Sequence, residues 1–298
     1  MVAPRFGQLL TAMVTPFDAA GALDLDVAGD LARFLVDQGS DALVVGGSTG
    51  EGSSLSDEER MTLFAAVADA VSVPVLAGTT SSDTARSVAL TSRVAATGVA
   101  GVLATTPAYA RPSQRGIAAH FSAVAESTRL PVMLYDIPVR TGRKIASSTT
   151  IDLVRAHGNI VALKDASADI VAAAATKSAL GESLDLYSGD DALILAFLAV
   201  GAVGLVSVAA HWAAPEFAAL IRSAHAGDWT AARALNARVA PSCMFETSDM
   251  YPNPLPAKAA MRSLGFAVGQ CRLPLGLSDD VLDQSAHEVV SALVATRG

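Results

Sequence analysis

The sequence predicts a (β/α)8 barrel, an α/β TIM-barrel fold, followed by a C-terminal helical region. Eight short apolar runs of strand character recur along the chain, and a longer segment with a helical pattern follows each of them. Strands of this kind pair in parallel and are covered on both faces. Eight units exceed the roughly six strands of a usual open sheet and match the number that closes a barrel. The length of 298 residues is ordinary for such a barrel.

The expected elements follow one another in regular alternation. The strands are expected at residues 9–14, 42–45, 75–77, 101–104, 132–135, 160–164, 184–187 and 204–208. The helices between and after them are expected at residues 25–38, 57–70, 83–96, 113–127, 149–156, 168–180, 190–200 and 214–226. Strand signals stop there, and three further helices are expected at 228–239, 256–264 and 279–296. We therefore divide the chain into a barrel, residues 1–226, and a C-terminal helical region, residues 227–298.

Composition excludes several classes of function. The net charge of −8 argues against nucleic acid and anionic membranes as partners. No run approaches the roughly 20 uninterrupted apolar residues of a membrane span, and the first residues lack the apolar stretch of a signal peptide. The two cysteines show no metal-ligand spacing and cannot form a disulfide framework. We therefore expect a cytoplasmic protein, and the scattered histidines and carboxylates predict no metal site.

The unusual polar segments all fall where predicted strands end. In a barrel of this kind, catalytic groups lie at the carboxyl ends of the strands and in the loops that follow. Tyr135 ends the fifth strand and Lys164 ends the sixth. Residues 46–51, 106–111 and 188–191 follow the second, fourth and seventh strands. These segments are therefore expected to meet on one rim.

Lys164 is the strongest single candidate on this rim. It is one of four lysines, and it ends the apolar run Ile160-Val161-Ala162-Leu163. Burying an ammonium group costs free energy or forces the amine neutral, and a neutral amine is the nucleophile of Schiff-base chemistry. A lysine whose ammonium group reaches solvent from the strand end is the alternative interpretation. The convergence of the other segments on the same rim favours the interpretation of Lys164 as a catalytic residue.

Three loops could serve a bound substrate. Residues 46–51 form a glycine-rich turn whose backbone N–H groups can hold a carboxylate, although a plain helix-capping turn has the same composition. The loop after Tyr135 carries Arg140, which can bind a carboxylate with two hydrogen bonds. The proline-framed loop 106–112 adds Tyr109. Packing and solvent exposure are the alternative roles for these tyrosines and this arginine. Asp190 and Asp191 are expected to cap a helix.

Taken together, the rim segments resemble those of the class I pyruvate aldolases of the dihydrodipicolinate synthase and N-acetylneuraminate lyase family. The resemblance covers roughly residues 7–278. Its motifs lie at residues 46–51, 106–112, 135–142, 164–166, 188–191 and 252–256. It implies a (β/α)8 barrel with a C-terminal helical region, assembled as a homotetramer (a dimer of dimers) or a homodimer. It also implies a covalent Schiff base with pyruvate and no other cofactor.

The resemblance assigns catalytic roles to four residues. Lys164 would form the Schiff base with pyruvate, and Tyr135 would be the general acid and base. The hydroxyls of Thr49 and Tyr109 would relay the proton, with Tyr109 reaching in from a neighbouring subunit. Ala108 stands where the family usually has an aromatic residue that interlocks the two subunits.

The resemblance also assigns the substrate-binding groups. Backbone groups of Ser48 and Thr49 would hold the pyruvate carboxylate. Arg140 would bind the carboxylate of the incoming aldehyde. Gly189 and Val206 would line the pocket.

Arg140 followed by Thr141-Gly142 resembles the synthases, which condense pyruvate with L-aspartate 4-semialdehyde on the route to diaminopimelate and lysine. An arginine suits the carboxylate of that aldehyde. Ser48 instead matches the lyases, so another pyruvate-dependent aldolase, acting on N-acetylneuraminate or a 2-keto-3-deoxy sugar acid, is the alternative. A non-catalytic barrel that senses a keto acid is a third interpretation. The joint presence of Lys164, Tyr135 and the relay hydroxyls disfavours it.

Feedback by lysine is expected to be weak or absent. Family members inhibited by lysine surround it with a carboxylate, an amide and histidines. At the matching positions this chain has Arg86, Ser82, Asp57 and Arg60. A cationic Arg86 facing a cationic effector is electrostatically unfavourable.

Overall fold

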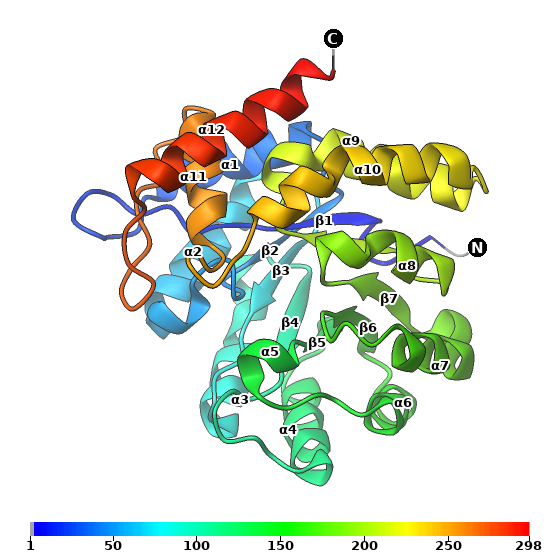
Figure 1. Cartoon of the computed structure of the whole chain (residues 1–298). Coiled ribbons are helices and arrows are strands. Elements are labelled where there is room, and N and C mark those ends of the chain that lie inside the picture. The colour runs from blue at the N-terminus through cyan, green and yellow to red at the C-terminus, as the bar shows by residue number, and fades with distance from the viewer. Residues whose placement is uncertain (1–2, 298) are drawn as a thin grey trace.

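The computed structural model describes residues 3–297 and contains a closed barrel of eight parallel strands surrounded by helices (Figure 1). Each strand pairs with the next one along the chain, and β8 pairs with β1 to close the barrel. The strands are β1 (Leu9–Ala12), β2 (Ala42–Val45), β3 (Val75–Gly78), β4 (Gly101–Thr105), β5 (Val132–Asp136), β6 (Ile160–Asp165), β7 (Asp185–Ser188) and β8 (Gly204–Ser207).

Helices follow the strands and cover the outside of the barrel. The α-helices of this layer are α1 (Leu25–Asp37), α2 (Asp57–Ala70), α3 (Thr84–Arg93), α4 (Gln114–Glu126), α6 (Ser147–Ala156), α7 (Ile170–Leu180), α8 (Ile194–Ala199) and α9 (Ala210–His225). The one-turn helix α5 (Pro138–Thr141) instead lies in the loop after β5, at the rim of the barrel. Short 3-10 turns accompany them: η1 (Gly52–Ser54), η2 (Val94–Thr97), η3 (Gly181–Ser183) and η4 (Asp191–Leu193). Three helices complete the chain: α10 (Trp229–Phe245), α11 (Leu255–Ser263) and α12 (Asp280–Ala295).

Aspartates start many of these helices. An aspartate at the position before the first helical residue accepts a hydrogen bond from a free N–H of the first turn, which stabilises a helix by about 1 kcal/mol. Ser56 and Glu59 form the reciprocal version of this arrangement at the start of α2. The capping aspartates are Asp24, Asp83, Asp169, Asp228 and Asp279.

The core has two layers because strand side chains alternate between the two faces of the sheet. Inward-facing residues such as Leu10, Val44, Leu103 and Met133 fill the barrel. Outward-facing strand residues pack against the helices in a larger cluster. This larger cluster also contains residues of α10, α11 and α12, so the C-terminal helices share the core of the barrel. Figure 1 shows these helices on the side of the barrel where α1 and α9 lie.

The predicted fold is confirmed, with each strand ending within one or two residues of its expected position. The helix predicted from residue 190 starts as the 3-10 turn η4, and α8 begins only at Ile194. Two other helix boundaries were wrong, both at a proline. Helix α9 begins at Ala210 rather than residue 214, because a bend at Ala213 lets the helix continue around Pro215. Helix α10 runs through Pro241 to Phe245 rather than ending at 239. The indole N–H of Trp212 donates to Ser242 Oγ at 2.9 Å, which holds the turn after that proline.

Candidate active site

Lys164 and Tyr135 lie side by side in the barrel. They are register partners on β6 and β5, so both side chains point to the same face of the sheet. Each residue is only 4% exposed. The Lys164 Nζ lies 4.3 Å from the centroid of the Tyr135 ring. The two residues predicted to carry the chemistry are therefore neighbours in a dry interior.

Gly189 leaves room for the Lys164 side chain. A Cβ atom built on Gly189 would lie 2.9 Å from Lys164 Cγ, closer than real contacts allow, and 3.1 Å from Lys164 Cε, which is tighter than most. The Gly189 N–H donates to the carbonyl of Asp165 at 2.7 Å, which fixes the glycine against the end of β6. A side chain at this position would crowd the stem of Lys164. The absence of a side chain at Gly189 thus leaves space for the lysine.

Burial sets the protonation of the Lys164 amine. Desolvation lowers the pKa of Lys164 from 10.5 to about 8, while the Asp191 carboxylate acts in the opposite direction and Arg140 lowers the pKa further. With this pKa about a quarter of the amines are neutral at pH 7.5, against about one in a thousand at the ordinary pKa of 10.5. Lys164 is therefore a competent nucleophile near neutral pH.

Two buried carboxyl groups lie close to the lysine. Asp191 accepts hydrogen bonds from the Ser207 hydroxyl and from the Val208 N–H at 2.9 Å. Burial, together with the charge of Asp191, raises the pKa of Glu246 well above its ordinary value. Burial raises the pKa of Asp191 as well, so the two carboxyl groups titrate as a coupled pair, and negative charge on Asp191 favours the protonated form of Lys164. The expected capping role applies to Asp190, which accepts from the Ala192 N–H at 3.0 Å, while Asp191 is buried beside the site.

Tyr135 keeps its proton. Burial raises the pKa of Tyr135 to about 12, with the Arg140 charge and the Ser48 side chain acting in the opposite direction. The phenol is therefore a hydrogen-bond donor across the physiological range. A buried, protonated phenol beside an amine can pass a proton to a developing alkoxide and recover it later.

The glycine-rich turn carries Thr49, whose side chain is fixed by the C-terminal region. Thr49 is buried, and its hydroxyl accepts a hydrogen bond from Asn253 Nδ2 at 3.0 Å. Ser48 is half-buried and faces a cleft. Asn253 lies in the segment between α10 and α11, more than two hundred residues away in the chain. Sequence reasoning gave it no role, although its motif at 252–256 carried part of the resemblance.

Arg140 lies at the rim rather than in the interior. It belongs to the short helix α5, and its Nη2 donates to the carbonyl of Asn253 at 2.9 Å. Together with Ser48 and Thr106 it lines a cleft of about 530 Å³. Lys164 and Tyr135 are buried in the barrel interior and do not line this cleft. A guanidinium held at the mouth can bind an anionic group of a substrate that enters.

Two further predicted residues occupy contrasting places. Val206 is fully buried in the barrel, in register with Leu10 of β1. Tyr109 is 96% exposed and has a left-handed backbone with φ of 70°. Its phenol is therefore not brought to the site within one chain. A non-glycine residue seldom adopts this backbone conformation.

Within residues 3–297 no helix is long and apolar enough to cross a membrane. The same residues contain no group of three or more histidine, cysteine or acidic side chains placed to hold a metal ion.

A buried lysine with a lowered pKa, next to a buried phenol at the carboxyl end of a parallel barrel, is the arrangement that Schiff-base aldolase chemistry requires. The chain belongs to the Dihydrodipicolinate synthetase (DHDPS) family, whose sequence model matches residues 5–293.

Named relatives agree with this assignment. The chain is 48% identical to a 4-hydroxy-tetrahydrodipicolinate synthase of Synechococcus sp. strain CC9605, over 98% of this chain and 96% of the relative. It is 44% identical to the protein of that name from Symbiobacterium thermophilum, over 97% and 98% of the two chains. Among solved structures, DHDPS from Cyanidioschyzon merolae with lysine bound superposes with a TM-score of 0.94 at 39% identity, covering 97% and 98% of the two chains.

Proposed function

We propose that this chain condenses pyruvate with L-aspartate 4-semialdehyde, the reaction of a 4-hydroxy-tetrahydrodipicolinate synthase. The observation that carries the proposal is the buried Lys164 amine, 4.3 Å from the Tyr135 ring and with a pKa near 8. Arg140 at the mouth supplies the charge that a carboxylate-bearing aldehyde needs. The relatives that match the whole chain carry this name. Coupled turnover with the semialdehyde tests the proposal.

The reaction begins at Lys164. Its neutral amine attacks the C2 carbonyl of pyruvate, a C–N bond forms, and water leaves to give the imine. Tyr135 donates the proton that the departing oxygen needs. The protonated imine then withdraws electrons from C3, so the Tyr135 phenolate takes a proton from C3 and the enamine forms. We propose that no metal and no organic cofactor is needed, because the imine itself is the electron sink.

The enamine then attacks the aldehyde. A C–C bond forms between pyruvate C3 and the aldehyde carbon, and the aldehyde oxygen takes the proton that Tyr135 relays. The amino group of the semialdehyde then attacks C2, and the bond between C2 and Lys164 Nζ breaks to release the product and the free amine. In our proposal backbone groups of Ser48 and Thr49 hold the pyruvate carboxylate, while Arg140 binds the carboxylate of the aldehyde. Gly189 and Val206 shape the pocket around the imine. The Thr49 hydroxyl and a Tyr109 phenol from a second subunit connect Tyr135 to solvent.

This use of Tyr109 requires assembly. We propose that the enzyme is a homodimer or a homotetramer built from two such dimers. The support is Tyr109 itself, which is almost fully exposed and has an unusual left-handed backbone. We also propose that the protein is cytoplasmic, where the unpaired thiols of Cys243 and Cys271 would stay reduced.

The lowered pKa of Lys164 predicts how activity depends on pH. Since only the neutral amine attacks pyruvate, kcat/KM for pyruvate should rise with pH and level off above an apparent pKa near 8. Tyr135, with a pKa near 12, stays protonated through this range. Initial rates between pH 6 and 9.5 in buffers of constant ionic strength measure the profile. A profile that still rises steeply at pH 9.5 would contradict the lowered pKa.

Replacement of Arg140 by alanine should act on one substrate. Loss of a charge-assisted hydrogen bond of about 1.5–3 kcal/mol should raise the KM for the semialdehyde about 10- to 100-fold. The KM for pyruvate should change by less than about 3-fold, because pyruvate is held by the turn at Ser48 and Thr49. Arg143→Ala is the matched control, since Arg143 donates to the carbonyl of Arg111 instead. An Arg140→Ala effect confined to pyruvate would contradict the role.

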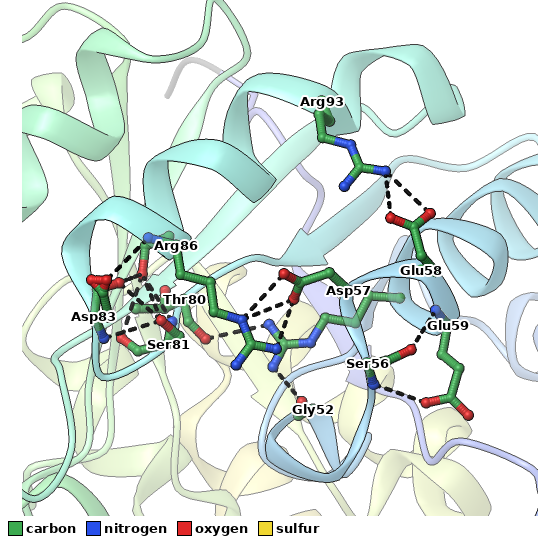
Figure 2. A network of polar contacts seen from close by, with 12 residues as sticks. Gly52, Ser56, Asp57, Glu58, Glu59, Thr80, Ser81, Asp83, Arg86 and Arg93 are labelled. Atoms are coloured by element: carbon green, nitrogen blue, oxygen red, sulfur yellow. Dashed lines mark hydrogen bonds and ion pairs between the residues drawn. The ribbon is translucent and has the colours of Figure 1, made fainter.

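Lysine is expected to inhibit weakly or not at all. Figure 2 shows Arg86 directed at Asp57, with its Nε 3.2 Å from both carboxylate oxygens and its Nη2 2.9 Å from one of them. Arg60, buried nearby, donates to the carbonyls of Gly52 and Thr80. Arg60 and Arg86 line the same cleft as Ser48 and Arg140. An ammonium ion placed there meets three arginines, Arg60, Arg86 and Arg140, and the Asp57 carboxylate is already paired with Arg86.

The measurement is a titration of the condensation rate with lysine at subsaturating pyruvate. We expect less than half inhibition at millimolar lysine. Half-inhibition well below about 1 mM would overturn the electrostatic argument.

A further inference from the structure

We propose that a buried ion pair between Glu51 and Lys258 positions the pyruvate-binding turn, which makes both of them positioning residues for the reaction. The pair joins the end of the turn at residues 46–51 to helix α11 of the C-terminal region. The inference rests on the proposed function, because it assumes that this turn holds pyruvate.

The ion pair is fully buried. Lys258 is 1% exposed and Glu51 is 0% exposed, and Lys258 Nζ lies 2.7 Å from Glu51 Oε1. The ammonium group also donates to the carbonyl of Gln270 at 2.9 Å and lies 4.2 Å from the centre of the Phe17 ring. The Lys258 amine therefore contacts Glu51, Gln270 and Phe17 at once, which indicates a structural role.

Glu51 is held at its other oxygen as well. The Arg272 N–H donates to Glu51 Oε2 at 2.8 Å. Glu51 has a left-handed backbone with φ of 52°, and its own N–H donates to the carbonyl of Ser48 at 3.2 Å. A glutamate adopts this conformation only where its surroundings enforce it. The side-chain contacts to Lys258 and Arg272 supply that constraint, two residues from Thr49.

The same C-terminal segment touches the site directly. Asn253 precedes Lys258 by five residues, donates to the Thr49 hydroxyl, and accepts from Arg140 through its carbonyl. The Lys258 N–H donates to the carbonyl of Pro254 at 3.0 Å, which couples the start of α11 to this contact. One segment thus holds the pyruvate turn at two points, Thr49 and Glu51.

The burial of both charges favours a geometric role. Desolvation offsets much of the attraction in a buried ion pair, so an apolar pair of similar volume stabilises a fold at least as well. What an ion pair adds is a fixed distance and direction between the two groups. Here it fixes the end of the turn whose backbone would bind the pyruvate carboxylate.

The test measures pyruvate capture without an aldehyde. Borohydride reduction traps the pyruvate imine, and intact mass gives the labelled fraction at each pyruvate concentration. Glu51→Gln and Lys258→Met should raise the pyruvate concentration for half-maximal labelling about 10-fold or more, with the label still on Lys164. Arg262→Met is the control, because it breaks the ion pair between the same helix and Asp283 but leaves Glu51 untouched. In Arg262→Met the pyruvate concentration for half-maximal labelling should stay within about 2-fold of that of the parent chain.

Folding of each variant is checked by circular dichroism and thermal unfolding. The double variant Glu51→Leu/Lys258→Met leaves neither of the two charges buried without its partner. It is therefore measured in the same assay if a single variant does not fold. Folded variants that capture pyruvate as the parent does would overturn the proposal, even with a lowered Tm. Labelling by pyruvate does not depend on which aldehyde the enzyme uses. A chain that binds pyruvate through this turn but does not use the semialdehyde would still show the increase in the pyruvate concentration for half-maximal labelling.

Discussion

Replacement of Lys164 by methionine is expected to abolish both imine formation and turnover. Methionine matches the length of the lysine stem and suits the apolar interior, so the barrel should fold without the buried amine. Without the Lys164 amine the imine with pyruvate cannot form, and the reaction loses its covalent intermediate. Turnover should fall by more than about 10⁴-fold, and borohydride with pyruvate should leave the mass of the protein unchanged. Intact mass spectrometry and the coupled rate assay measure the two effects.

Two other lysines serve as controls for this experiment. Lys177→Met removes a partly exposed amine that donates to the carbonyls of Gly181 and Leu184, and it should keep full labelling and activity. Lys258→Met removes the second fully buried amine of the chain, and the remaining label should still map to Lys164. A pyruvate adduct that persists in Lys164→Met, on any residue, would show that the nucleophile lies elsewhere.

Replacement of Tyr135 by phenylalanine is expected to have the second-largest effect. The ring and its packing remain, while the phenolic proton is lost. A positioned general acid or base accelerates a reaction by about 10²- to 10⁴-fold, so the turnover rate should decrease by a factor in that range. Imine formation should become slow but remain complete after long incubation, since Lys164 keeps its lowered pKa. Single-turnover trapping at short and long times separates the rate from the extent.

The barrel contains a matched control for this change. Tyr187 stands in register with Lys164 on β7 and is equally buried, but its hydroxyl donates to the carbonyl of Gly7 at 2.8 Å. Tyr187→Phe should cost about 1 kcal/mol of stability through that lost hydrogen bond and leave kcat unchanged. Equal losses of activity in the two variants would mean that packing, and not the proton of Tyr135, carries the effect.

Local pattern was enough to predict the barrel and its central pair. Short apolar runs define the strands, and the rule that polar groups collect at strand ends places Lys164 and Tyr135 on one rim. Because neighbouring parallel strands are in register, two residues at the ends of β5 and β6 must be close. Gly189 directly follows the end of β7, so the same rule places it on this rim. These positions depend on contacts between elements that are adjacent in the chain.

The missed residues depend on contacts between distant segments. Glu246, Asn253 and Lys258 lie beyond the barrel strands, in stretches that read as ordinary helix or loop. Each meets the site only after the C-terminal helices pack back onto the barrel. Lys258 in particular gives no local signal, because a lysine in a helix is usually exposed. Its partner Glu51 comes from a turn that could equally have been a plain helix cap.

The most direct test of the central claim is the condensation of pyruvate with L-aspartate 4-semialdehyde. The product is coupled to a dihydrodipicolinate reductase, and loss of the reduced nicotinamide follows the rate. We predict robust turnover that requires both substrates and disappears in Lys164→Met. Folded protein that forms the pyruvate adduct but does not turn over the semialdehyde would contradict the claim and identify an aldolase for another aldehyde.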